Sequence, residues 1–218
     1  MPLLRFPRRL FFVLVLPLLL GGCAGLLPGA GPAPNMYNLT PKNTFPQGMT
    51  PVRWQLVIEE PLAAGGLDTN RIALRPRPTE LKYFAGSRWT ERAPRMVQTL
   101  IVESFENTGA ITAVGRQAIG LRSDYSLKTE MREFQAEYFN GDGRPPRIRV
   151  RLNAKLVRKP RENIVASRTF EKVITAEGTN MQAIVLAFDT ALGKVIKQLV
   201  VWTLREGEAD WRQQPGQG

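Results

Sequence analysis

Three long stretches of alternating apolar and polar residues, between positions 125 and 174, constrain the fold more than any other feature of this chain. Alternation with a period of two is typical of strands that bury one face. The first stretch changes phase once near Arg132 and Glu133, and one extra residue there predicts a β-bulge. The turn sequence NGDG at 140–143 and the segment KPREN at 159–163 separate the stretches. We therefore expect an antiparallel meander at the centre of a sheet.

Two further segments repeat apolar residues at helical spacing. The first lies within 90–109, with Thr90 as the predicted N-cap, and the second begins at Thr179 or Asn180 and closes at Trp202. Shorter strands are expected at 52–58, 71–74, 81–84 and 111–115. The predicted fold class is α+β: a two-layer sandwich in which two amphipathic helices pack on one face of an antiparallel sheet.

The only cysteine of the chain, Cys23, stands where an N-terminal apolar run ends. A basic start with three arginines, an apolar stretch over 10–20 and the small residues 21–22 describe a secretory signal peptide. The apolar stretch is shorter than the roughly 20 residues that a transmembrane helix needs. Leu20 and the small pair before the cysteine resemble a bacterial lipobox, which predicts cleavage directly before Cys23 and its acylation. A chance cysteine in an ordinary signal peptide is the alternative.

An acylated Cys23 would carry a diacylglycerol and an N-acyl chain such as palmitate. Two or more acyl chains anchor a protein stably, whereas one chain binds a membrane only marginally. In bacterial lipoproteins an aspartate after the cysteine favours inner-membrane retention, so Ala24 points to the outer membrane. The sequence is expected to divide into a signal peptide at 1–22, an acylated N-terminus and Pro/Gly-rich tether at 23–51, the α+β domain at 52–204 and a polar, disordered tail at 205–218.

The net charge of +11 falls to +8 once the three arginines of the signal peptide are removed. A basic balance suggests an anionic partner, and an exported protein meets lipid head groups or acidic protein faces rather than nucleic acid. Charges that merely solvate the surface are the alternative. The chain has no histidine, which removes Ser-His-Asp, Cys-His and histidine-ligated metal sites. We expect no catalysis, no metal site and no cofactor besides the covalent lipid.

One strand of the meander carries a row of cations. Because side chains alternate along a strand, these cations project from the face opposite Ile148 and Val150. They are Arg147, Arg149, Arg151 and Lys155. The functional interpretation is a contact surface for phosphate head groups or an acidic partner. The alternative is a solvated sheet face on which acids of neighbouring strands, such as Glu130 and Glu171, balance the charge.

Taken in order, the lipobox and a series of short segments resemble the ABC-type transport auxiliary lipoproteins, the family of paraquat-inducible protein C. No single segment is specific, but their order and spacing cover nearly the whole predicted domain. The segments lie at 36–39, 66–72, 81–84, 88–89, 124–127, 134–138 and 187–202.

This resemblance implies an outer-membrane lipoprotein that faces the periplasm and works by contact rather than reaction. Its implied partners are an MCE-domain periplasmic protein with its ABC permease and ATPase, in an intermembrane lipid transport system. The implied fold is similar to the N-terminal domain of the periplasmic protein of the Tol system. Family members can assemble into homo-oligomeric rings. Two alternatives stay open: a structural envelope lipoprotein that handles no lipid, and a periplasmic hydrolase that uses paired carboxylates.

Overall fold

The structure is a computed structural model that describes residues 32–116, 123–139, 141 and 143–214. The predicted signal peptide, Cys23 and the first part of the predicted tether lie outside the described residues. The same holds for two residues of the NGDG turn and for the last four residues of the chain. The description below concerns the unit Pro34–Gly218.

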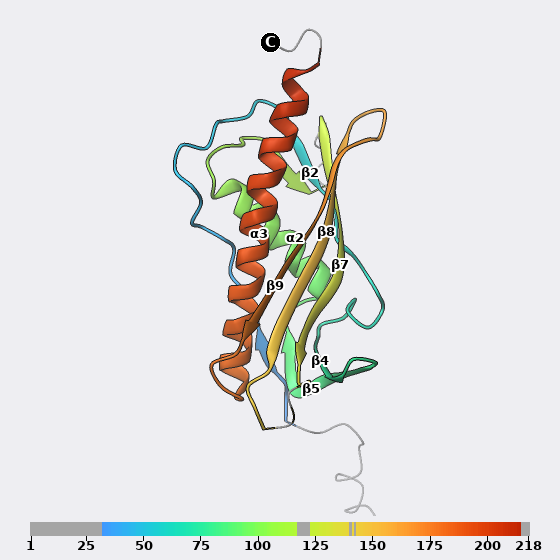
Figure 1. Cartoon of the computed structure of the whole chain (residues 1–218), viewed down its shortest axis with the longest axis vertical. Helices are drawn as coiled ribbons and strands as arrows, with labels where there is room; N and C mark the ends of the chain where they lie inside the picture. The colour runs from blue at the N-terminus through green and yellow to red at the C-terminus, as the bar shows by residue number, and fades with distance from the viewer. Residues whose placement is uncertain (1–31, 117–122, 140, 142, 215–218) are drawn as a thin grey trace, which may run out of the picture. The chain divides into compact units, whose positions relative to one another are not determined.

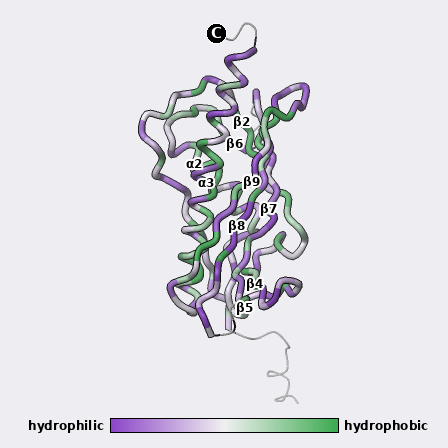
Figure 2. The backbone as a smooth tube through the Cα atoms, in the orientation of Figure 1, coloured by the Kyte–Doolittle hydropathy of each residue, from purple (hydrophilic) through white to green (hydrophobic). Residues whose placement is uncertain are grey.

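The three long alternating stretches form β7 (Tyr125–Glu137), β8 (Arg147–Arg158) and β9 (Asn163–Thr175). They pair antiparallel in chain order, which confirms the predicted meander (Figure 1). The pairing of β7 with β8 shifts register between Met131 and Glu133, which confirms the predicted bulge. Hydrophilic and hydrophobic residues are interspersed along these strands (Figure 2), as expected for a sheet that buries one face.

The sheet is mixed, and the prediction of a wholly antiparallel sheet is wrong. β7 pairs parallel with three shorter strands on its other edge, and two further pairs, β2 with β6 and β1 with β5, are also parallel. The shorter strands are β1 (Asn35–Tyr37), β2 (Leu56–Ile58), β3 (Leu62–Ala63), β4 (Arg71–Arg77), β5 (Glu80–Trp89) and β6 (Val114–Arg116). Of these, only β4 and β5 form an antiparallel hairpin.

The parallel pairs follow from the long connections between the strands. Parallel neighbours need a crossover of a dozen or more residues, commonly one that contains a helix. The connection between the parallel neighbours β2 and β6 is of this kind, and it includes β3, the β4–β5 hairpin and the helix α2 (Ala93–Glu106). Strand-like alternation predicts that a segment pairs, but it does not give the direction of its partner.

Within the part of the chain that the structure describes, two helices pack against a nine-stranded open sheet (Figure 1). In α2 the apolar residues at helical spacing are buried, and the polar Gln98 is buried with them and donates to the carbonyl of Ile58 at 2.9 Å. The predicted N-cap Thr90 is wrong: Arg92 occupies that position, and the Thr90 amide donates to Tyr37 at 2.9 Å. The helix α3 (Met181–Arg212) begins at Asn180, whose side chain accepts from the Ala183 amide at 2.9 Å.

One core connects both helices to the sheet. At its centre the Phe188 ring of α3 lies 5.3 Å from Trp89 and 5.2 Å from Phe134, measured between ring centroids. All three side chains are at most 2% exposed. Aromatic pairs in this range contribute about 1 kcal/mol each beyond the area that they bury. The chain therefore holds its core without a disulfide among the described residues.

The second half of the predicted tether is part of the folded domain, which corrects the predicted boundary at 51. β1 adds to the edge of β5, and Leu39 is 3% exposed. The Thr40 amide and hydroxyl donate to the Asp189 carboxylate of α3 at 2.7 and 2.9 Å. The Lys42 amide donates to Ser104 at 2.9 Å. Prolines and glycines in this segment restrict helix and strand formation, but they do not prevent it from packing in an extended path.

The predicted disordered tail is also wrong over 205–212, because α3 continues to Arg212. Buried Leu204 and Gly207 extend the packed face of the helix past its predicted end near Trp202. The Trp211 ring lies 6.4 Å from Tyr125 of β7. The polar composition of this segment predicts a disordered tail, yet its few apolar residues fall on the face of the helix that meets the sheet.

Candidate functional site

The predicted contact surface lies on the outer face of β8. The alternate residues Ile148, Val150, Leu152, Ala154 and Leu156 are fully buried on the other face, as predicted. The cations Arg147, Arg149 and Arg151 are half-buried, and Lys155 is exposed. The structure thus brings the predicted cations together on one side of one strand.

The two central arginines of this row are ion-paired. Arg149 lies 2.8 Å from Glu137 and 2.7 Å from Glu171, measured between nitrogen and carboxylate oxygen. Arg151 lies 2.8 Å from Glu133, which also pairs with Arg75 at 3.3 Å. Three arginines therefore meet three glutamates, and this outer-face network carries no net charge.

Within the described residues, Arg147 and Lys155 have no ion-pair partner, and they stand at the two ends of the row. The prediction that this face contacts a partner stays a prediction, and only these two cations are free to carry it. The sequence pointed to Glu171 as a balancing acid, and that choice is confirmed. The contribution of Glu133 and Glu137 was missed because the bulge decides which β7 residues stand beside Arg149 and Arg151.

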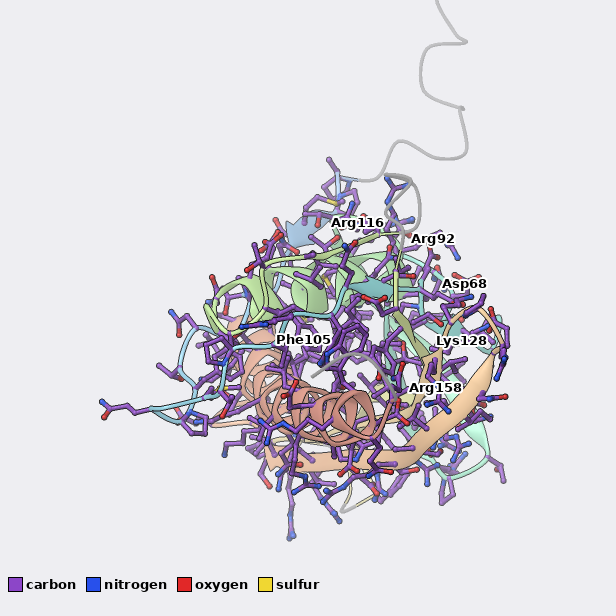
Figure 3. The ribbon with its side chains drawn as sticks, turned by 90° about the horizontal axis from the view of Figure 1, so that it is seen from above. Asp68, Arg92, Phe105, Arg116, Lys128 and Arg158 are labelled. Atoms are coloured by element: carbon purple, nitrogen blue, oxygen red, sulfur yellow. The ribbon has the colours of Figure 1, made fainter. Side chains whose placement is uncertain are left out.

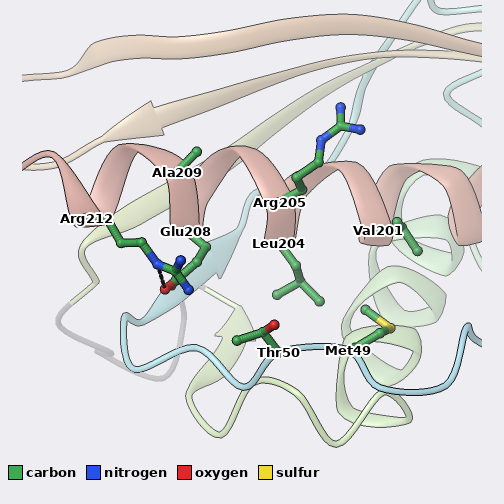
Figure 4. A pocket seen from close by; sticks show the side chains of 8 residues that line it. All are labelled: Met49, Thr50, Val201, Leu204, Arg205, Glu208, Ala209 and Arg212. Atoms are coloured by element: carbon green, nitrogen blue, oxygen red, sulfur yellow. Dashed lines mark hydrogen bonds and ion pairs between the residues drawn. The ribbon is translucent and has the colours of Figure 1, made fainter.

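A first groove lies between the N-terminal segment and the exposed side of α3, with a volume of about 380 Å³. Figure 4 shows Met49 and Thr50 facing the side chains of Val201, Leu204 and Glu208 across it. The Arg212 guanidinium donates to Glu208 at 2.7 Å and closes one end. Aliphatic and thioether groups supply most of its walls, so the groove suits an apolar ligand segment.

A second pocket of about 580 Å³ lies between β9 and α3. Its residues on β9 are Arg168 and Lys172, and those on α3 include Lys194, Lys197 and Arg205. No acidic side chain lines it. We refer to it as the basic pocket. This site was not predicted from the sequence, because its cations come from two elements that lie far apart in the chain and meet only in the fold.

A polar cluster ties the C-terminal end of α3 to the sheet. The Tyr125 hydroxyl donates to Asp210 at 2.7 Å and accepts from the Gln214 amide at 2.9 Å. The Arg158 guanidinium donates to the same Asp210 carboxylate at 3.2 Å. Burial, followed by the hydrogen bond to Asp210, raises the pKa of Tyr125 above its ordinary range.

We expect Tyr125→Phe to lower the free energy of unfolding by about 1.5 kcal/mol at neutral pH, because a hydrogen bond to a carboxylate is lost. The contribution of Tyr125 is complete below pH about 10, where tyrosine ionises in the unfolded chain. Above that pH the folded state binds more protons than the unfolded state, so this contribution declines as pH rises. Urea unfolding should therefore show a gap between wild type and variant that narrows above pH about 10.

The half-buried Tyr37 of β1 provides the control for this prediction, because its hydroxyl is not part of the Asp210 cluster. Tyr37→Phe should lower the free energy of unfolding at neutral pH by less than Tyr125→Phe does. A Tyr125→Phe gap that stays constant from pH 8 to the alkaline limit of folding would contradict the prediction.

A second charged cluster lies at the periphery of the domain. The Arg92 guanidinium donates to Asp68 at 2.7 Å and lies 3.1 Å from Glu60. Figure 3 shows Asp68 and Arg92 close together at the rim, whereas Phe105 lies among the interior side chains. The hydrogen bond that Arg92 donates to Asp68 is the main cause that raises the pKa of Arg92. This cluster links the loop after β3 to the start of α2, which is a structural task.

The described residues contain no helix both long and apolar enough to span a bilayer. They also contain no group of three or more cysteine, aspartate or glutamate residues placed to hold a metal ion. What the described structure offers is a set of surfaces and grooves on an α+β domain. These surfaces and grooves are the candidate sites of the described domain.

The comparison with protein families assigns the chain to a family. The chain belongs to the ABC-type transport auxiliary lipoprotein component family, whose pattern matches residues 37–200. The resemblance seen in the sequence is therefore confirmed. The role of this family is auxiliary to transport and not catalytic, it is associated with an ABC transport system, and its members are lipoproteins anchored to a membrane.

Individual relatives are similar over most of the chain. The crystal structure of protein XCC0632 from Xanthomonas campestris is 36% identical with a TM-score of 0.77, and covers 82% of this chain and 99% of that chain. The uncharacterized protein bll6063 of Bradyrhizobium diazoefficiens is 32% identical over 188 residues, or 85% of this chain and 49% of that protein. The chain thus spans about half the length of this curated relative.

A further crystal structure, of an uncharacterized protein, shares the fold at 15% identity with a TM-score of 0.60. It covers 80% of this chain and 98% of that chain. The fold is therefore shared at low sequence identity.

Proposed function

We propose that this chain is an outer-membrane lipoprotein that serves as the docking component of an MCE-type ABC lipid transport system and works by binding. The observation that carries this proposal is the match to the transport auxiliary lipoprotein family over residues 37–200. The absence of histidine from the whole chain also favours binding over general acid–base catalysis.

The proposed anchor, Cys23, lies close in sequence to the folded domain. The first strand, β1, begins at Asn35, so the segment between them is short. A chain of about ten residues reaches at most about 35 Å when fully extended. An acylated Cys23 would therefore hold the domain close to its membrane, within reach of an MCE-domain protein that spans part of the periplasm.

Capture of the full chain by the transport proteins tests the docking role. The chain is co-expressed with a tagged MCE-domain protein, the permease and the ATPase from its own genome, and the complex is purified in mild detergent. We expect the lipoprotein to co-purify, and an outer-membrane lipoprotein of another family to be absent. If the three transport proteins elute together without this chain, docking to an MCE system is wrong.

Replacement of Cys23 tests the anchor. We expect Cys23→Ala to remove all labelling by radioactive palmitate and to shift the protein out of the outer-membrane fraction, because no other side chain of the chain accepts the thioether-linked lipid. Sucrose-gradient fractionation and autoradiography measure both effects. A labelled variant, or an unlabelled wild-type chain, would contradict acylation at this residue.

A further inference from the structure

The basic pocket places cations on the side of β9 that usually carries apolar residues. In the antiparallel pair, Arg168 stands opposite Ala154 and Lys172 opposite Val150. Directly opposed residues of neighbouring strands share a face. Arg168 and Lys172 therefore lie on the core side of the sheet. The buried Phe170 lies between them on the same face.

The core side of β9 is accessible to solvent here because, among the described strands, β9 pairs with β8 alone and forms an edge of the sheet. Side chains on the core side of an edge strand can reach solvent beside the helix that covers them. On α3 the facing positions are Lys194, Lys197 and Arg205, spaced at 3 and 8 residues so that they follow one helix face. Cations from two elements therefore converge on one hollow.

The charges in this hollow are not balanced by the protein. Of its five cations, Arg205 alone has an acidic partner among the described residues, Glu206 at 2.6 Å. Arg168, Lys172, Lys194 and Lys197 form no ion pair there, although the outer-face network pairs its three arginines. Like charges gathered beside a low-dielectric wall repel one another, and an anion bound among them would remove this cost.

The floor of the basic pocket is apolar. Val201 and Trp202 line it, and the Trp202 ring packs against Phe170 at 5.5 Å between centroids. Val201 and Arg205 also line the first groove, whose walls include Met49 and Leu204. A cationic hollow therefore lies beside an apolar groove along α3, with Val201 and Arg205 shared between them, which is the pattern expected for a ligand with an anionic head and an apolar chain.

We propose that the basic pocket binds the phosphate head group of an anionic phospholipid, with an acyl chain lying along Val201 toward Met49 and Leu204. This inference rests on the proposed function and names the substrate class that the lipoprotein would receive. Inward-pointing charges on an edge strand also discourage pairing with another strand. That role explains Arg168 and Lys172, but it does not require three cations on the facing helix.

The test uses the full chain in non-ionic detergent and calorimetric titration with dihexanoylphosphatidylglycerol at low salt. Dihexanoylphosphatidylcholine controls for partition into micelles, and glycerophosphoglycerol and inorganic phosphate control for the head group alone. We expect saturable binding of the anionic lipid that Lys172→Gln with Lys197→Gln weakens about thirtyfold. The matched control is Arg88→Gln with Arg161→Gln, which removes the same charge at two exposed positions that line neither hollow and should change the affinity less than about threefold.

The other outcomes overturn either this inference or the docking role. Equal weakening by both double variants would show non-specific attraction to a basic protein. Equally tight binding of phosphatidylcholine, glycerophosphoglycerol or phosphate would remove the anionic lipid as the specific ligand. Binding of polyglutamate with no binding of lipid would assign the pocket to an acidic protein partner. Lipid binding by a chain that the MCE proteins do not capture would sink the docking role alone, and capture without lipid binding would sink this inference alone.

Discussion

Replacement of Arg149 by methionine is expected to lower the free energy of unfolding by about 3 kcal/mol. The Glu137 side chain that it pairs with is 3% exposed, so the variant leaves a carboxylate buried without its cation. Removing one member of a buried ion pair costs about 3–5 kcal/mol, and the 29% exposure of Arg149 places this case at the lower end. Urea unfolding followed by circular dichroism measures the change.

Two further variants test whether the loss of stability comes from the Arg149–Glu137 ion pair or from removing any cation of the β8 row. Arg147→Met, on the same strand and face but without an ion-pair partner in the described structure, should change stability by less than about 0.5 kcal/mol. Glu137→Gln combined with Arg149→Met should recover more than half of the loss, because the buried charge is gone. If Arg147→Met lowers the free energy of unfolding as much as Arg149→Met does, the broken ion pair is not the cause of the lost stability.

The outer face of β8 shows which structural features the alternation of apolar and polar residues can predict. The alternation of this strand predicted both of its faces, because five consecutive inward positions are apolar and any other register would expose them. The bulge was predictable from the phase change near Arg132 for the same reason. Which carboxylates stand beside Arg149 and Arg151 was not predictable, since that depends on how the bulged β7 is registered against β8.

The strand directions and the basic pocket lie beyond what a single sequence shows. β2 and β6 contain three residues each, and nothing in such short segments specifies a parallel partner. The basic pocket needs the docking of α3 beside the edge strand β9 to bring its cations together. Each cation taken separately occupies a position that a solvated helix or strand would also fill.

The C-terminal half of α3 shows the opposite error, in which composition was given more weight than spacing. Residues 205–212 are mostly polar and were interpreted as a tail, although Gly207 and Trp211 continue the helical face of Leu204. Gly207 is buried because Trp54, from a segment about 150 residues earlier, packs directly on it. A glycine at this position permits the close approach that fastens the end of the helix to the sheet.

We expect Gly207→Ala to lower the free energy of unfolding by about 2 kcal/mol. A Cβ atom at this position would lie 2.6 Å from Cζ2 and 2.9 Å from Cη2 of Trp54. The indole cannot easily move, because it is 1% exposed and its ring lies 5.0 Å from that of Tyr125. Overpacking of this kind costs about 1–3 kcal/mol, and the higher helix propensity of alanine offsets only about 1 kcal/mol of it.

The glycine at 193 in the same helix provides a matched control, because a Cβ there would meet only the flexible Lys42 side chain at 3.7 Å. Gly193→Ala should leave stability unchanged or raise it by up to about 1 kcal/mol. In the Trp54→Phe background the six-membered indole ring that the new methyl group strikes is gone, so Gly207→Ala should cost less than about 1 kcal/mol. An equal cost in both backgrounds would mean that Trp54 does not set the position of α3, and that the end of the helix is held by the Asp210 cluster instead.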